Sequence, residues 1–436
     1  MKFAAPAYLA SYFLSILGNS IAAVALPLIV LRTTGSVLGT GSVAAATAIP
    51  AIFAGLFMGV VIDRFNRRDC SIVTDLISAF SIAALPIVDQ IFGLTLSWFI
   101  LLGIVGSLGD LPGLAARTAL LPAVLRHSGA SAERMAGFSQ VLVSIAMLAG
   151  PALAGTLMAA LPGSTVLWIT AGTSLLAAVT TFLIPRQVGD VPAGASASSA
   201  QPGAIGWRAV REGWQVLLHS PFLVAVAAIS SLSIMAFGAL QGLILPVYFT
   251  GIDQPSSLGF VLSAMAVGTL AGGAIYGIAG RRGARRRWLM TGLIGTTIGF
   301  AAIATLASVT MILIGAVILG LSSALYSGLF GVLSIERVPE HVRGRIAGIQ
   351  NALITAAVPL GIMGAAVLIE VGSLLVAVVA AAGVWGVAVA TGLFAPALRD
   401  LTPRSIATDD SPPSEAANDL ADARPALVDS TSALTG

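Results

Sequence analysis

The hydrophobic positions of this chain form long unbroken runs that do not alternate with polar positions. A helix needs about 20 apolar residues to cross the hydrocarbon core of a bilayer, whereas the strands of a membrane barrel alternate apolar and polar residues. The pattern therefore predicts an all-α membrane protein with twelve transmembrane helices. The twelve runs lie at about 7–31, 37–62, 69–91, 95–119, 138–160, 165–184, 221–250, 257–279, 289–306, 309–334, 345–370 and 372–396.

The amino-acid composition excludes several classes of protein. Hydrophobic residues make up 57% of the 436 positions and charged residues only 9%, whereas about a quarter of the residues of a soluble domain are charged. So few charges cannot cover the surface of a soluble enzyme of this size. The single cysteine has no partner for a disulfide, and the three histidines are dispersed. We therefore expect no disulfide scaffold, no metal site and no cofactor.

The basic residues gather in every second loop. Lys and Arg resist crossing the membrane and accumulate on its cytoplasmic side, so we expect a multi-pass protein of the plasma membrane with both termini in the cytoplasm. Topology explains these basic loops, so they do not imply nucleic-acid binding. Only Arg32 falls on the other side. The cytoplasmic set is Arg64, Arg67, Arg68, Arg117, Arg126, Arg134, Arg186, Arg208, Arg211, Arg281, Arg282, Arg285, Arg286, Arg287, Arg337, Arg343 and Arg345.

A stretch rich in Pro, Ala, Ser and Gly at about 187–205 divides the spans six and six. Such a composition makes a flexible linker. Trp207, Val210, Trp214 and Leu217 follow at helical spacing, which predicts an amphipathic helix on the inner membrane face. A docking site for a partner is the alternative. The expected organisation is an N-terminal half at 1–186, a linker with its helix at 187–220, a C-terminal half at 221–398 and a disordered cytoplasmic tail at 399–436.

Two matches within the sequence relate the halves. Residues 59–68, after the second run, resemble residues 277–286, after the eighth. Residues 134–142 of the fifth span resemble residues 345–353 of the eleventh, and Gly150 then aligns with Gly361. Each match joins a span to the one six places later, which crosses the membrane in the same direction. The halves are therefore expected to be parallel repeats, pseudo-symmetric about an axis along the membrane normal.

The loop at 59–68 resembles the signature of the major facilitator superfamily, and with the six-six split this likeness covers about residues 5–400. The signature residues are Gly59, Asp63, Arg64, Arg67 and Arg68. The departure is Asn66, where the family usually has Gly. Since Asn tolerates a left-handed turn, we expect the backbone role of this position to survive. Arg281 stands where the second copy would have its acid, so no matching role is expected there.

Three further segments, 31–36, 150–155 and 338–345, resemble the branch that includes macrolide efflux pumps and the enterobactin exporter. Members of that branch export drugs or siderophores, mostly driven by protons. The resemblance thus implies a small-molecule substrate, proton coupling and alternating access. The fourth span departs from the branch with Gly109, Asp110, Pro112 and Gly113, which leaves the substrate open.

The resemblance also implies roles for two motifs. The loop motif is a conformational latch, in which Asp63 at a helix end faces the positive start of the eleventh span, near Arg345. Its alternative is a solvated basic loop that serves topology alone. Gly150 and Pro151 form a helix kink of the kind associated with alternating access in proton antiporters, because Pro removes a backbone donor.

Asp110 is the candidate for proton coupling, because it is the deepest acidic residue of the chain and acids within the membrane are rare and costly. A structural ion pair with another helix, or a role in substrate binding, is the alternative. Arg117 lies seven residues on, at a spacing that makes direct pairing doubtful, so an anchor at the inner face is expected for it. Asp75 and Asp89 are expected to have structural roles near the ends of the third span. Candidates for lining a substrate cavity are Asn19, Gln140, Gln241, Tyr326 and Asn351, each with packing as the alternative.

The chain carries no enzyme motif, and it lacks the GxxxxGK[ST] loop that ATP-driven export would need. We expect a monomeric, proton-driven exporter of a small hydrophobic or amphipathic molecule such as a drug, an antibiotic or a siderophore. Two alternatives remain open on the same sequence. One is an importer or facilitator of a small metabolite, and the other is a lipid-handling or sensor membrane protein.

Overall fold

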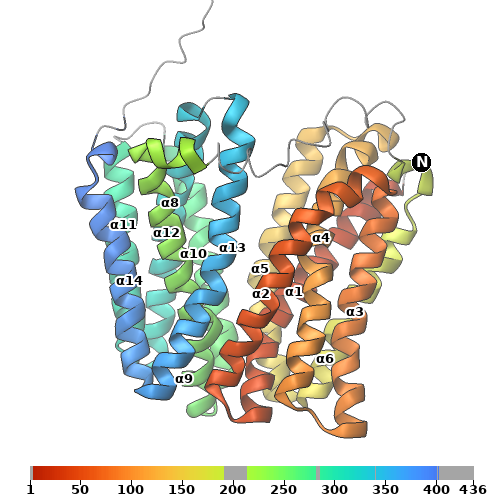
Figure 1. Cartoon of the computed structure of the whole chain (residues 1–436), viewed down its shortest axis with the longest axis horizontal. Coiled ribbons are helices and arrows are strands. Elements are labelled where there is room, and N and C mark those ends of the chain that lie inside the picture. Colours follow the sequence, from red (N-terminus) through yellow and green to blue (C-terminus); the bar gives the residue numbers. More distant parts are fainter. Residues whose placement is uncertain (1–2, 191–213, 281–284, 339, 400, 402–436) are drawn as a thin grey trace, which may run out of the picture.

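The computed structural model describes residues 3–190, 214–280, 285–338, 340–399 and 401. These residues form long helices, of which twelve are long and apolar enough to cross a membrane, as the hydrophobic runs predicted (Figure 1). The first half comprises α1 (Ala4–Thr34), α2 (Val37–Arg64), α3 (Arg67–Phe92), α4 (Leu96–Ser128), α5 (Ala132–Ala160), α6 (Gly163–Phe182) and η1 (Arg186–Gly189). The second comprises α8 (Pro221–Ala239), η2 (Leu240–Ile244), α9 (Leu245–Gly251), α10 (Pro255–Ala279), α11 (Arg285–Ala304), α12 (Val309–Arg337), α13 (Glu340–Val371), α14 (Leu374–Phe394) and η3 (Pro396–Leu398).

Short polar residues fix where several helices begin. The first N–H groups of a helix have no intrahelical acceptor, and a Ser or Asn side chain at the N-cap supplies one. The Ser36 hydroxyl, for example, accepts from the Gly39 N–H at 2.9 Å. The other N-caps of this kind are Asn66, Ser131, Ser220, Ser308 and Ser373.

Asn66 has a different role from the one expected of it. Its φ of −60° and ψ of 121° are extended, not left-handed, so the loop does not need glycine-like freedom at this position. Instead its side chain caps α3 by accepting from the N–H groups of Arg68 and Asp69. Its amide also donates to the Arg186 carbonyl at 3.0 Å and to Asp190 at 2.7 Å. The expectation of a turn residue is therefore corrected to that of a capping residue that ties the loop to η1.

The internal repeat is visible in the packing. Gly150 of α5 lies so close to α1 that a Cβ at this position would overlap Ser20. Gly361 of α13 lies equally close to α8, where a Cβ would overlap the Met235 carbonyl oxygen. The two aligned glycines thus make the same contact, of the fifth span on the first and of the eleventh on the seventh. Small residues at helix interfaces allow such close backbone approach in membranes.

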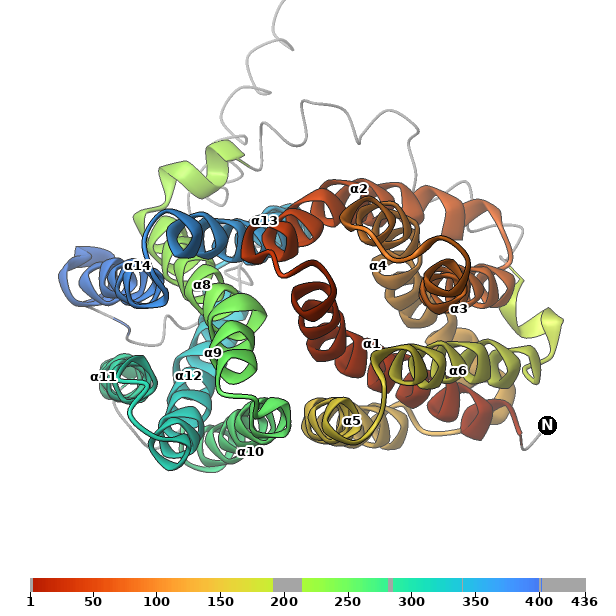
Figure 2. The same ribbon diagram turned by 90° about the horizontal axis from the view of Figure 1, so that it is seen from below.

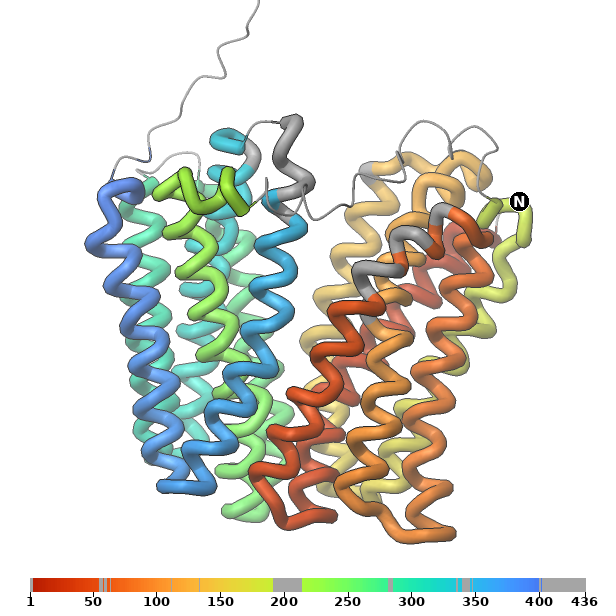
Figure 3. Tube along the Cα trace, viewed as in Figure 1, coloured from red at the N-terminus to blue at the C-terminus, as the bar shows by residue number. Residues whose placement is uncertain are grey.

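The two halves meet at one end and diverge toward the end that carries the N-terminus (Figures 1 and 3). Most of the contact comes from two helix pairs, α2 with α13 and α5 with α10 (Figure 2), and smaller contacts join α1 to α9 and η2. In the second pair a Cβ at Gly259 would overlap the carbonyl oxygen of Pro151. The Ser263 hydroxyl donates to the Leu148 carbonyl at 2.6 Å in the same place. The Gly150–Pro151 segment of α5 therefore lies at the junction between the halves.

Replacing Gly259 with Val should destabilise this junction, because the added side chain has no space against α5. Overpacking of this kind costs about 1–3 kcal/mol. The expected result is a lower unfolding temperature of the purified protein in detergent. Gly273→Val on the same helix is the matched control, since nothing lies within 4 Å of a Cβ there. Equal melting of the two variants would contradict the close α5–α10 contact.

An ion pair fastens α11 to α12 at the end where the halves diverge. Arg285 contacts both carboxylate oxygens of Glu336, at 2.5 and 2.7 Å. Glu336 lies beyond the apolar part of α12, Val309–Ser334. The hydrogen bonds from Arg285 lower the pKa of Glu336.

A lowered pKa in the folded state stabilises the protein above the ordinary pKa of Glu, and this contribution is lost as the pH falls through the folded value. Wild-type protein should therefore lose stability relative to Glu336→Gln as the pH falls below about 4.3. Unfolding temperatures measured across that range test the expectation. Curves that stay parallel would show that this ion pair contributes nothing.

Two expected segments fall largely outside the described residues. Of the amphipathic helix predicted after the linker, residues 214–219 are helical and Leu217 is buried. Of the linker predicted at about 187–205, residues 187–190 are described, and the first three of them belong to η1; the rest lies outside the described residues. So does the predicted tail, apart from residues 399 and 401.

Candidate functional site

A cavity of about 610 Å³ lies between the two halves, and α2 and α13 both contribute to its wall. Its walls come from α1, α2, α3 and α4 of the first half, from α13 of the second, and from Gly242 in the π-helical turn η2. Most of the lining is aliphatic, with Leu26, Val43, Ile82, Val358 and Ile362 among the contributors. Cavities of about 300–1,000 Å³ with such walls hold small organic ligands.

Among the described residues that line this cavity, Asp110 is the single ionisable one. It lies near the middle of α4, since that helix runs on to Ser128, beyond the expected limit of the fourth span. The side chain is exposed to the cavity, and the Ser78 hydroxyl donates to its carboxylate at 2.9 Å. A cation or a proton can therefore reach this carboxylate from the cavity.

The other polar lining residues are mostly paired within their own helices. Thr40, Thr47, Ser81 and Ser107 each donate to a carbonyl of the preceding turn. Asn19 and Thr355 differ, because no side-chain hydrogen bond joins either of them to another described residue. Asn19, Thr355 and Asp110 therefore offer hydrogen-bonding capacity to a ligand on a largely apolar wall.

A buried ion pair lies behind Asp110, between the same two helices. Arg117 of α4 pairs with Asp75 of α3, and the two residues are 3% and 4% exposed. The Ser15 hydroxyl of α1 accepts from Arg117 at 2.9 Å and donates to Asp75 at 3.4 Å. Arg117 is thus part of the interior of the first half, which corrects the expectation of an anchor at the inner face. The ion pair and its contacts with Ser15 offset part of the cost of burying the two charges, and loss of either partner would leave the other uncompensated.

Small residues flanking Asp110 bring α3 and α4 close enough for both contacts. A Cβ at Gly109 would lie 2.6 Å from the Thr74 carbonyl oxygen, and one at Gly113 would lie 3.1 Å from the Thr74 hydroxyl. The segment of the fourth span that departed from the resembled branch is therefore the one that packs α4 on α3. Asp110 and Arg117 stand two turns apart and both face α3, in agreement with their spacing, but they do not pair with each other.

The remaining cavity candidates do not line the wall. Gln140 and Asn351 are exposed, and Gln241 is half-buried in η2. Tyr326 is 3% exposed, and its ring packs edge-on against Phe330 and tilted against Trp385, with centroid distances of 5.8 and 6.2 Å. The expectation of a cavity role for Tyr326 is corrected to packing within the second half, because its ring is enclosed by other aromatic side chains.

The latch motif is described in part. The surroundings of Gly59 and the side chains of Asp63 and Arg345 lie outside the described set, so the pairing of Asp63 with the start of α13 stays an expectation. Arg64 is exposed. Arg67 donates to the Ala119 carbonyl at 3.3 Å, and Arg68 donates to the Phe182 carbonyl at 2.7 Å. These two arginines join the start of α3 to α4 and α6 within the first half.

The pairing of Asp75 with Arg117 and the contact of Ser78 with Asp110 were missed from the sequence. The spacing of the polar residues on these two helices does contain a signal for both contacts. Asp75 and Ser78 are three residues apart, so they share one face of α3, and Asp110 and Arg117 are seven apart on α4. Each of the two apolar helices thus carries two polar residues on one face. This pattern indicates that the polar faces of α3 and α4 contact each other.

Comparison with known proteins agrees with this architecture. A family model described as "Major Facilitator Superfamily" matches residues 8–254 and 227–429. The chain is 30% identical over 393 residues to "Multidrug efflux pump Tap" of Mycobacterium tuberculosis (strain ATCC 25618 / H37Rv), covering 88% of this chain and 91% of the relative. It is 25% identical over 357 residues to "Macrolide efflux protein A" of Streptococcus pyogenes, covering 80% and 85%.

Solved structures show the same fold. The nucleoside transporter NupG is similar with a TM-score of 0.70 and 15% identity, covering 89% of this chain and 98% of NupG. A bacterial homologue of the human lysosomal transporter Spinster, inward-facing and occupied, has a TM-score of 0.67 and 14% identity, covering 90% and 96%. The likeness to these structures establishes the fold alone. Together with the family match over nearly the whole length, it shows that this chain is a multi-pass membrane transporter of the major facilitator superfamily, and its relatives place it in the drug-exporter branch.

Proposed function

We propose that the protein exports a small hydrophobic or amphipathic molecule by proton antiport with alternating access. The observation that carries this proposal is the apolar cavity of about 610 Å³ with one carboxylate, Asp110, on its wall. An apolar wall selects by size and hydrophobicity more than by hydrogen-bond pattern, which suits varied substrates. The relatives, a multidrug efflux pump and a macrolide efflux protein, support export of such compounds.

Coupling follows from what one carboxylate can hold. An ionised Asp110 in an apolar cavity attracts either a proton or the positive part of a ligand, and it cannot hold both. Closing the cavity around an unpaired charge is costly, so the closed states are those in which Asp110 carries a proton or a ligand. Each passage of substrate in one direction is thereby exchanged for a proton in the other.

Alternating access requires that the cavity open to one side at a time. The arginine-rich helix ends all lie at the end where the halves diverge, and we propose that this end is cytoplasmic, with both termini. The conformation is then inward-open, sealed on the outside by α2 with α13 and by α5 with α10. The segment Gly150–Pro151 would bend as the α5–α10 contact is broken. One chain builds the whole cavity, so we propose that a monomer suffices.

The loop motif is proposed to latch the opposite, outward-open state. Asp63 would then approach the start of α13 near Arg345, at a positively polarised helix end. Asp63→Asn should slow transport without abolishing substrate binding, because the cavity is elsewhere. Transport rate and binding measured on the same purified variant test this role. A normal transport rate would contradict the latch.

Drug accumulation in cells tests the function as a whole. Expression in a host without its own efflux pumps should lower the accumulation of erythromycin or of a lipophilic cation, and a protonophore should restore it. Higher accumulation on expression would indicate an importer or facilitator. No change in accumulation would favour a lipid-handling or sensor protein.

A further inference from the structure

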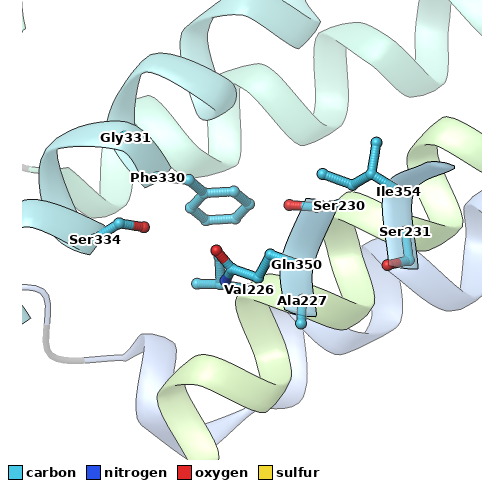
Figure 4. Close-up of a pocket in the computed structure, with 9 residues that line it drawn as sticks. All are labelled: Val226, Ala227, Ser230, Ser231, Phe330, Gly331, Ser334, Gln350 and Ile354. Atoms are coloured by element: carbon cyan, nitrogen blue, oxygen red, sulfur yellow. The ribbon is translucent and has the colours of Figure 1, made fainter. Parts of the chain in front are cut away.

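A second, smaller cavity lies within the second half, between α8, α12 and α13 (Figure 4). Its volume is about 110 Å³. Four of its nine lining residues carry uncharged polar side chains, namely Ser230, Ser231, Ser334 and Gln350. None of the nine is ionisable. We call this cavity the polar recess.

The polar side chains of the recess have no side-chain hydrogen-bond partner among the described residues. Elsewhere in the spans, hydroxyls such as those of Ser233 and Ser323 donate to carbonyls of the preceding turn. No side-chain hydrogen bond joins Ser230, Ser334 or Gln350 to another described residue, and the buried Ser231 hydroxyl also has no partner. Polar groups left unpaired inside a membrane are costly. Their presence together indicates that a ligand or water completes their hydrogen bonds.

The geometry directs these groups toward one space. In Figure 4 the hydroxyls of Ser230 and Ser334 and the carboxamide of Gln350 surround the ring of Phe330, while Ser231 lies farther off and points away. Phe330 is 5% exposed, and its ring forms part of the wall of the recess. A group entering the recess would therefore meet donors and acceptors from three helices and an aromatic face.

The recess adjoins the large cavity. Ile354 lines both of them. On α13, Gln350, Ile354, Val358 and Ile362 follow one another at intervals of four residues, which places them along one face of the helix. The first belongs to the recess and the last two to the large cavity. A ligand lying along this face would have one end in each.

We propose that the recess binds an uncharged hydrogen-bonding group, such as a hydroxyl, a sugar edge or an amide, of the molecule whose apolar body occupies the large cavity. The inference rests on the proposed function and adds to it a substrate class. A charged group would find no counter-charge among the nine lining residues, and burial of an unpaired charge is costly. Ser and Gln side chains can donate and accept, so either type of neutral group can be satisfied.

A matched pair of probes tests the recess. Butyltriphenylphosphonium offers an apolar cation for the large cavity near Asp110, and (4-hydroxybutyl)triphenylphosphonium differs from it by one hydroxyl. Wild-type protein in detergent should bind the hydroxylated probe about fivefold more tightly, as expected for one net hydrogen bond. The double variant Ser230→Ala/Ser334→Ala should lose this preference while binding the plain probe within about twofold of wild type. Ser323→Ala, whose hydroxyl is already paired on α12, should keep the preference.

The outcomes separate the recess from the proposed function. Equal binding of the two probes by wild-type protein, or a preference that survives in the double variant, would contradict the proposal that the recess binds a neutral polar group. The export function would be unaffected by either result. Failure of wild-type protein to bind either probe would count against the export function, and the proposed role of the recess, which rests on that function, would be lost as well. Loss of the plain probe as well in the double variant would show that the two serines serve packing, which also overturns the assignment.

Discussion

Replacing Asp110 with Asn should abolish proton-driven export while the protein remains folded. Asn keeps the size of the side chain and can still accept from Ser78, whose hydroxyl lies 2.9 Å from the carboxylate. It cannot take up or release a proton. Binding of a lipophilic cation should weaken about 10- to 100-fold, because a charge-assisted contact worth about 1.5–3 kcal/mol is lost. Transport by reconstituted protein and binding in detergent measure the two effects.

Asp89→Asn is the matched control for that experiment, since Asp89 is exposed near the far end of α3. It should transport as wild type does. The binding that remains in Asp110→Asn should no longer depend on pH, because no other ionisable side chain lines the cavity among the described residues. Active, pH-dependent export by Asp110→Asn would show that another group couples the proton.

The second large effect is expected at the buried ion pair. Arg117→Met leaves the carboxylate of Asp75 buried without its partner. Breaking such a pair from one side costs about 3–5 kcal/mol. The protein should therefore unfold at a much lower temperature in detergent, and expression should fall. Arg126→Met, an exposed position on the same helix, should melt as wild type does.

The double variant Asp75→Asn/Arg117→Met shows whether the loss of stability comes from the unpaired charge of Asp75 or from the lost packing of the arginine side chain. It removes both charges, so most of the stability should return, as happens when a buried ion pair is replaced as a unit. If the double variant melts as low as Arg117→Met alone, the arginine acts through packing of its long side chain. The ion pair would then not be the main interaction that stabilises the contact between α3 and α4.

Much of the fold could be predicted because the bilayer imposes a simple requirement. Every span must satisfy its own backbone and present apolar residues, so each of the twelve apolar runs formed a helical span, although some helices extend beyond the run, as α4 does to Ser128. The six-six division followed from the composition of residues 187–205. The glycines 150 and 361, aligned in the sequence, proved to make equivalent helix contacts.

Side-chain partners could not be predicted in the same way, because they depend on how helices rotate and slide against each other. Arg117 is near the inner end of the fourth hydrophobic run, which suggested an anchor, yet α4 continues to Ser128 and carries it into the interior. Tyr326 is polar at one end only, and its ring packs against Trp385 where the sequence allowed either packing or a cavity role. Asn66 matched a family position for glycine, but besides capping α3 its amide donates to the Arg186 carbonyl of η1, 120 residues away along the chain.

The measurement that tests the account most directly is exchange of substrate for protons in liposomes that contain only this protein. Vesicles with an acidic lumen in a neutral medium should accumulate erythromycin or a lipophilic cation above its external concentration, and the lumen should become alkaline as they do so. Asp110→Asn should show neither effect. Uptake that stops at the external concentration, with no change in lumenal pH, would contradict proton antiport and leave a facilitator.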